Sequence, residues 1–129
     1  MKARFITFEG IEGSGKSTVV SRVHDALEGA GVESIITREP GGTDLSERIR
    51  AILLDPAMGG MDARAELLLY LASRAQLVGK IIRPALDRGT SVICDRFMDA
   101  SVAYQGWARG IGEDVVEELN AFTLGTTVP

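Results

Sequence analysis

A glycine-rich segment followed by a lysine and a serine carries the clearest chemical signal in the sequence. Residues 10–17 read Gly-Ile-Glu-Gly-Ser-Gly-Lys-Ser and have the spacing Gly-x-x-x-x-Gly-Lys-Ser. Glycines allow backbone N–H groups to approach phosphate oxygens closely, Lys16 supplies positive charge for the β- and γ-phosphates, and the Ser17 hydroxyl is a ligand for Mg²⁺. The segment predicts a P-loop whose nucleotide-binding residues are Gly10, Ile11, Glu12, Gly13, Ser14, Gly15, Lys16, Ser17 and Thr18.

A short apolar run that ends in an acid supplies a second part of such a site. Val92, Ile93 and Cys94 precede Asp95, and strands of this kind in βα units form a buried parallel sheet. The carboxyl ends of such strands meet at one edge, so Asp95 should face the P-loop and hold Mg²⁺ or its water ligands. Cys94 is the only cysteine, and we expect a buried, unreactive thiol there.

Three further polar clusters bear on what receives the phosphoryl group, because a P-loop alone leaves ATPase, GTPase and kinase open. Tyr70 and Arg74 are four residues apart, so an aromatic ring and a guanidinium share one side of a helix. Together the three clusters supply an aromatic ring for stacking, hydrogen-bonding groups and several arginines. This set around one cleft indicates a pocket for a nucleoside monophosphate. The other two clusters are Arg38–Thr43 with Glu47, Arg48 and Arg50, and Asp95–Phe97 with Ser101, Tyr104 and Gln105.

The elements that must position these groups alternate between strands and helices. We expect strands at residues 4–8, 34–37 and 92–94. We expect helices from about Lys16 to Gly29, from Thr43 or Asp44 to Asp55, and from Asp62 onward, with a kink at Pro84, an end at Gly89, and a further helix after the last strand. Met58–Met61 should be a loop. The pattern predicts an α/β fold, a parallel sheet flanked by helices, in one domain spanning residues 1–129.

Composition and charge exclude several classes of partner. The net charge of −4 argues against a nucleic-acid or anionic membrane surface, because such partners need a broad basic field. No stretch is long and apolar enough to span a bilayer, and the N-terminus lacks a signal-peptide core. We therefore expect a cytoplasmic protein whose partner is a small molecule. Only three of its fourteen basic residues are lysines, and arginine suits a small anionic ligand.

Four motifs together make the chain similar to a known family. They are Phe8–Ser17, Arg38–Thr43 (Arg-Glu-Pro-Gly-Gly-Thr), Ser73–Gln76 (Ser-Arg-Ala-Gln), and Asp95–Phe97 followed by Ala103–Gly106. In this order and spacing the chain closely resembles thymidylate kinases of the bacterial kind. The resemblance implies the P-loop NTPase fold and transfer of the γ-phosphoryl group of ATP to dTMP, giving dTDP and ADP for dTTP synthesis.

The same resemblance implies roles for individual residues. Arg74 would bond a thymine carbonyl and Tyr70 would stack on the base. The acceptor phosphate is already an oxyanion, so catalysis needs alignment and charge neutralisation more than a strong base. The implied substrate-binding residues are Glu39, Arg50, Tyr70, Arg74, Arg96, Ser101 and Gln105, the catalytic residues are Glu12, Lys16, Asp95 and Arg96, and the metal ligands are Ser17 and Asp95.

The chain departs from the family in a few residues and in length. Tyr70 stands where phenylalanine is usual, Phe97 where tyrosine is common, and Ser46 where glycine is usual. The resemblance implies another core strand, an arginine-bearing lid and a final helix beyond Pro129. We therefore expect a domain that lacks its C-terminal strands and lid, leaves residues 5–8 as an open apolar edge strand, and turns over poorly or not at all.

Two other functions stay open at this point. One is a non-catalytic nucleotide-binding module that kept the pocket without the lid. The other is a P-loop ATPase or a P-loop kinase for a different nucleoside monophosphate, although the pairing of Arg74 with Gln105 argues against a purine, which needs a larger pocket. The resemblance also implies a homodimer.

Overall fold

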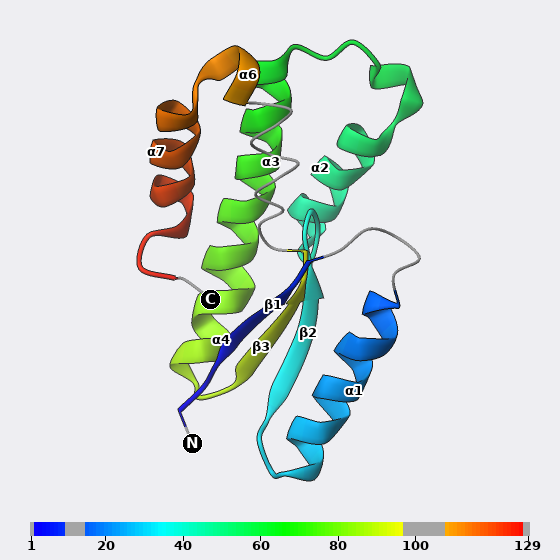
Figure 1. The fold of residues 1–129 in the computed structure, drawn as a ribbon, viewed down its shortest axis with the longest axis vertical. Coiled ribbons are helices and arrows are strands. Elements are labelled where there is room, and N and C mark those ends of the chain that lie inside the picture. The colour runs from blue at the N-terminus through cyan, green and yellow to red at the C-terminus, as the bar shows by residue number, and fades with distance from the viewer. Residues whose placement is uncertain (1, 10–14, 97–107, 128–129) are drawn as a thin grey trace.

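A parallel sheet of three strands forms the centre of the molecule (Figure 1). The computed structural model describes residues 2–9, 15–96 and 108–127. Strands β1 (Phe5–Phe8), β2 (Ser34–Arg38) and β3 (Ser91–Asp95) lie in the order β1-β3-β2. The predicted strands are confirmed to within one residue at each end. Within the described residues β1 is an edge strand, as expected, and β3 is central.

Helix α1 (Lys16–Gly29) covers one face of the sheet and lies against β2 and β3 (Figure 1). Val20 is its buried residue. The helix ends at Gly29 as predicted, and Gly31 then adopts a φ of +77°, a conformation that glycine takes at low cost. The turn leads directly into β2.

The next two helices begin at the predicted caps. The Thr43 hydroxyl accepts a hydrogen bond from the Ser46 N–H at 3.0 Å and starts α2 (Asp44–Leu54). The Asp62 carboxylate accepts one from the Arg64 N–H at 2.9 Å and starts α3 (Ala63–Leu77). Between them Pro56–Met58 forms a 3₁₀ turn, η1, so the expected loop begins one residue later than predicted.

The expected kink near Pro84 takes the form of a π-helical segment. After α3 the backbone continues as η2 (Val78–Ile82), with π-helical hydrogen bonding, and then as α4 (Arg83–Asp87). Proline has no N–H to donate and its ring crowds the preceding turn. The wider π turn upstream of Pro84 lets the helix pass this residue without stopping, and Gly89, with φ of +86°, ends it as predicted.

The final described segment contains α6 (Ala108–Ile111) and α7 (Glu113–Leu124), where the sequence predicted one helix. Figure 1 shows α7 beside α3, on the side of the sheet opposite α1. A small cluster of Leu67, Leu71 and Val116 joins the two helices. The main core lies between the sheet and the α3–α4 segment and consists of Phe5, Leu77, Val78, Ile82, Ala85, Val92, Cys94 and Leu124.

Cys94 is buried as expected. Its exposed fraction is 0%, and burial raises the pKa of its thiol. A buried thiol with a raised pKa carries little reactive thiolate. None of the helices in the described part of the chain is long and apolar enough to cross a membrane.

Candidate functional site

The register of the sheet brings the ends of all three strands to one edge. Asp95, at the end of β3, pairs with Phe8 on one side and Arg38 on the other. The ladder extends one step further, because the Arg96 N–H donates to the Phe8 carbonyl at 2.8 Å and the Glu39 N–H donates to the Asp95 carbonyl at 3.0 Å. In a parallel sheet this carboxyl edge is where ligands bind.

Lys16 and Asp95 meet at this edge, as the sequence predicted. The Lys16 ammonium lies 2.6 Å from Asp95 Oδ1, and the two side chains are 11% and 26% exposed. Lys16 is the first residue of α1, and Gly15 before it has a φ of +81°, which glycine adopts readily. The helix N-terminus and the lysine therefore present positive charge next to an acid, an arrangement suited to phosphate groups and their metal ion.

The oxygen atoms near Lys16 fit a magnesium ion. Ser17 lies exposed in the first turn of α1. The Oδ1 atom of Asp95 is buried and, within the described ranges, accepts no well-directed hydrogen bond. The Lys16 ammonium lies close to this oxygen. No cluster of three or more carboxylate, histidine or cysteine side chains occurs among these residues. Mg²⁺ commonly takes one or two protein oxygens and completes its shell with phosphates and water.

A shallow pocket opens beside Asp95 along β2. Its volume is about 310 Å³, and its lining includes the exposed Arg38 and the buried Thr37. The Thr37 hydroxyl makes no hydrogen bond within the described part of the chain. A hydroxyl in that position can donate to a ligand that enters the pocket. The lining residues are Ile36, Thr37, Arg38, Gly42 and Asp95.

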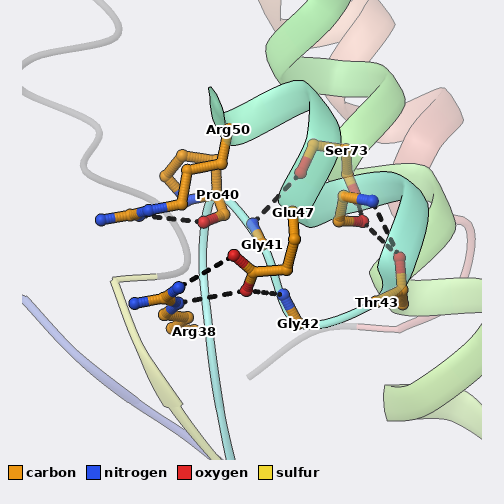
Figure 2. A network of polar contacts seen from close by, with 9 residues as sticks. Arg38, Pro40, Gly41, Gly42, Thr43, Glu47, Arg50 and Ser73 are labelled. Atoms are coloured by element: carbon orange, nitrogen blue, oxygen red, sulfur yellow. Dashed lines mark hydrogen bonds and ion pairs between the residues drawn. The ribbon is translucent and has the colours of Figure 1, made fainter. Parts of the chain in front are cut away.

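The loop after β2 is held in shape by the helix that follows it (Figure 2). The Glu47 carboxylate accepts hydrogen bonds from Arg38, at 3.2 Å from Nε and 2.8 Å from Nη2, and from the Gly42 N–H at 2.9 Å. The hydrogen bonds from Arg38 and from Gly42 lower the pKa of Glu47. Gly42 has a φ of +97°, and a Cβ there would lie 2.6 Å from Leu77 and 2.5 Å from Thr37 Oγ1. Only glycine fits this turn without displacement.

The same loop is fastened to α3. Figure 2 shows the Ser73 hydroxyl facing Gly41, whose N–H donates to it at 3.3 Å. The Ser46 hydroxyl donates to the Ser73 carbonyl at 2.9 Å, and both serines are 0% exposed. Ser46 thus adds a buried hydrogen bond between α2 and α3. Arg50 Nη1 donates to the Pro40 carbonyl at 3.0 Å, so its guanidinium lies over this loop.

Arg74 is held by residues from two other elements. Its Nε donates to Glu39 Oε1 at 2.7 Å, its Nη2 donates to the same oxygen, and its Nη1 donates to Asn120 Oδ1. Arg74 is 4% exposed, Glu39 1% and Asn120 8%. The sequence predicted Glu39 and Arg74 as substrate-binding residues, and the structure brings them together.

Burial governs the ionisation of this group. Desolvation raises the pKa of Glu39 to about 7, although the charge and hydrogen bonds of Arg74 oppose the rise. Tyr70 lies beside the pair, with the Arg74 Cζ 5.3 Å from the centre of its ring, a cation–π distance. Burial, followed by the negative charge of Glu39, raises the pKa of the Tyr70 hydroxyl. The predicted i, i+4 pairing of Tyr70 and Arg74 is therefore confirmed as a contact.

The remaining expected site residues fall into two groups. Arg96, at the end of β3, is half-buried and has a φ of +60°, which is uncommon for a residue with a Cβ. Thr18 is exposed in the first turn of α1. The other expected residues lie outside the part of the chain that the structure describes: Gly10, Ile11, Glu12, Gly13, Ser14, Ser101 and Gln105.

Sequence reasoning missed Asn120. Its position carried a signal, because Val116, Asn120 and Leu124 are spaced by four residues and all three are buried on one face of α7. An amide in the middle of an apolar stripe needs a buried partner. The partner, Arg74, lies 46 residues earlier in the chain, and spacing alone does not identify it.

A family model described as thymidylate kinase matches residues 8–129. Curated relatives agree with this match. Thymidylate kinase of Bacillus pumilus is 50% identical over 129 residues, which cover 100% of this chain and 61% of that protein. Thymidylate kinase of Syntrophotalea carbinolica is 54% identical over 125 residues, or 97% of this chain and 58% of that protein.

A solved structure shows the same fold. The crystal structure of thymidylate kinase from Ehrlichia chaffeensis is 42% identical in sequence and superposes with a TM-score of 0.80, covering 95% of this chain and 69% of that chain. The chain spans about 60% of the length of the curated relatives named above.

Proposed function

The chain belongs to the thymidylate kinase family, and we propose that the protein transfers the γ-phosphoryl group of ATP to dTMP, giving dTDP and ADP. The observation that carries the proposal is the family match over residues 8–129. The meeting of Lys16 and Asp95 at the carboxyl edge of the sheet supports it, because a phosphate-binding lysine and a metal-holding acid are what phosphoryl transfer requires there.

At the phosphate end, Lys16 acts by changing partners. In the described state its ammonium faces Asp95. When ATP binds, Lys16 would contact the β- and γ-phosphates, with residues 10–18 forming the phosphate-binding loop. Asp95 and Ser17 would hold Mg²⁺, which would supply positive charge against the negative charge that develops during phosphoryl transfer.

At the acceptor end, arginines align the phosphate of dTMP. Arg96 and Arg50 clamp it, and the attachment of Arg50 to the Pro40 carbonyl supports this role by placing its guanidinium over the loop after β2. The family resemblance gives Glu12 a role beside the sugar hydroxyl and the metal. Because the acceptor oxygen is already negative, alignment and charge neutralisation lower the barrier without a strong general base.

The base is read by residues around Arg74. Arg74 donates to a thymine carbonyl, Tyr70 stacks on the ring, Glu39 anchors the guanidinium, and Ser101 and Gln105 address the base edge. The buried pair of Glu39 and Arg74 supports this proposal, since an arginine with fixed partners presents its donors in a defined direction.

An assay of ADP production with dTMP, dCMP or dGMP as acceptor tests the proposal. We expect the full-length protein, meaning a protein that carries this chain at the length of the curated relatives, to produce ADP from ATP and Mg²⁺ in a dTMP-dependent manner and to prefer dTMP to the other two. Calorimetric titration run in parallel separates binding from turnover. Selective dTMP binding without turnover would favour the alternative of a nucleotide-binding module, and equal rates with all three acceptors would refute the substrate assignment.

We also propose a homodimer in the cytoplasm. The family resemblance suggests the dimer, and exposed apolar side chains on α2 and α3, among them Leu45, Ile52 and Leu68, support it because large apolar side chains gathered on helices favour association. Sedimentation equilibrium of the full-length protein tests the assembly. A monomer at all concentrations would contradict it.

A further inference from the structure

Three of the contacts that the Arg74 guanidinium makes restrict different motions of the group. Glu39 accepts from both Nε and Nη2, but with the single oxygen Oε1. Two donors on one acceptor atom form a pivot about which the group can still swing in its own plane. The ring of Tyr70, whose centre is 5.3 Å from Cζ, lies under the guanidinium and limits its motion toward that side. The bond from Nη1 to Asn120 Oδ1 lies away from the pivot and fixes the rotation within that plane.

An asparagine at position 120 is buried, and a buried amide lowers the stability of the protein unless it is hydrogen-bonded. Asn120 is 8% exposed and lies between Val116 and Leu124 on the buried face of α7. Val116 packs on Leu67 and Leu71 of α3, so an apolar side chain is sufficient to join the two helices. Packing therefore does not explain an asparagine at this position.

We propose that Asn120 is a positioning residue for base recognition, which sets the in-plane orientation of Arg74 through its side-chain oxygen. The inference rests on the proposed function, in which Arg74 donates to a thymine carbonyl. Through this contact α7 takes part in selectivity although Asn120 need not touch the nucleotide. A cytosine carries an amino group where thymine carries a carbonyl, so a correctly aimed Arg74 favours dTMP over dCMP.

The test compares dTMP and dCMP binding to variants of the full-length protein by calorimetry. Asn120→Leu removes the acceptor and keeps the volume, and Asn120→Ala removes both. Asn120→Asp keeps an acceptor oxygen in the same place. Val116→Ala is the matched control, because it loosens the packing of the same helix on α3 and leaves the Arg74 bond in place.

We expect the ratio of dCMP to dTMP dissociation constants to fall about tenfold or more in Asn120→Leu and Asn120→Ala, as for the loss of a hydrogen bond to a charged group. Asn120→Asp should retain most of the ratio. Val116→Ala should lower the melting temperature with the ratio unchanged. A purely structural role would lower the melting temperature of every variant and leave the ratio constant.

The outcomes separate the two proposals. A wild-type protein without preference for dTMP would overturn the proposed function and this inference with it. A selective wild-type protein whose folded Asn120→Leu or Asn120→Ala variant keeps the same ratio would overturn the inference alone. Failure of both variants to fold, with Val116→Ala folded, would assign Asn120 to stability and also overturn it.

Discussion

Two ion pairs near the carboxyl ends of the strands differ in their contact with water. The side chains of Lys16 and Asp95, whose charged atoms are 2.6 Å apart, are 11% and 26% exposed, whereas the side chains of Arg74 and Glu39 are 5% and 0% exposed. Lysine is a flexible point charge, and the rigid fork of arginine holds fixed geometry. The first pair can therefore exchange partners when a ligand arrives, and the second is already assembled. In the proposed binding site, the phosphate end would therefore rearrange on binding and the base end would stay in place.

The largest expected effect comes from breaking the buried pair. Above pH 7, where Glu39 is ionised beside Arg74, Arg74→Met removes the cation of a buried pair, and loss of one partner of such a pair costs about 3–5 kcal/mol of unfolding free energy. Denaturant unfolding measures this loss. The double variant Glu39→Gln with Arg74→Met should recover part of the stability, because no unpaired charge remains. If the single variant is as stable as the wild-type protein, the pair is not buried in solution.

At the less buried pair, Lys16 and Asp95, the effect should fall mainly on activity. Lys16→Met removes the charge that is proposed to contact the phosphates, and we expect the rate of dTMP-dependent ADP production to fall about 10²–10³-fold. The unfolding free energy should fall by less than in Arg74→Met, because the Asp95 side chain is 26% exposed and that of Glu39 is 0% exposed. Lys80→Met, at an exposed lysine of η2, is the matched control. Full activity of Lys16→Met would remove Lys16 from the proposed site.

The buried pair should also make stability depend on pH. Burial raises the pKa of Glu39 from an ordinary 4.5 to about 7. Between these values the unfolded chain has lost the proton and the native chain keeps it, so the unfolding free energy falls as pH rises from 4.5 to 7. Glu39→Gln cannot titrate, and the difference between wild-type and variant unfolding free energies should show this fall. A constant difference would indicate that Glu39 is ionised beside Arg74 throughout.

The smallest effect is expected at the exposed pair of Arg38 and Glu47. Both side chains are well exposed, at 52% and 41%, so Glu47→Gln should cost less than about 1 kcal/mol. The pKa of Glu47 is lowered in the native state, so its contribution is present above pH 4.5 and is lost as the pH falls through the lowered value. Denaturant unfolding at two pH values measures the contribution of Glu47 to the unfolding free energy. Glu117→Gln, at an exposed glutamate, is the control. A loss of several kcal/mol would mean that Glu47 is essential to the loop.

Local chemistry made much of the fold predictable. Local side-chain and backbone preferences predict the strands, the helix caps Thr43 and Asp62, and the helix ends at Gly29 and Gly89. All of these are confirmed. The position of Asp95 next to Lys16 follows from the parallel order of the strands. The π segment upstream of Pro84 was not predicted, because proline signals a disturbance without specifying how the helix absorbs it.

The contacts of Arg74 with Glu39 and Asn120 could not be predicted from the sequence. Its i, i+4 neighbour Tyr70 was predictable from helix geometry. Glu39 and Asn120 lie 35 and 46 residues away, on a loop and on another helix. These contacts depend on how the loop after β2 and helix α7 pack on α3, which is settled by tertiary structure. The roles of these residues in binding stay predictions.

The central place of β3 has a consequence for how the chain is made. In the described part of the chain β1 and β2 pair with β3, the last of the three strands to be synthesised. A ribosome adds about 5–20 residues per second, so β1 and β2 wait several seconds for the strand that joins them. Contacts of such long sequence separation also slow folding. During synthesis the apolar edges of β1 and β2 therefore rely on neighbouring helices or chaperones for protection.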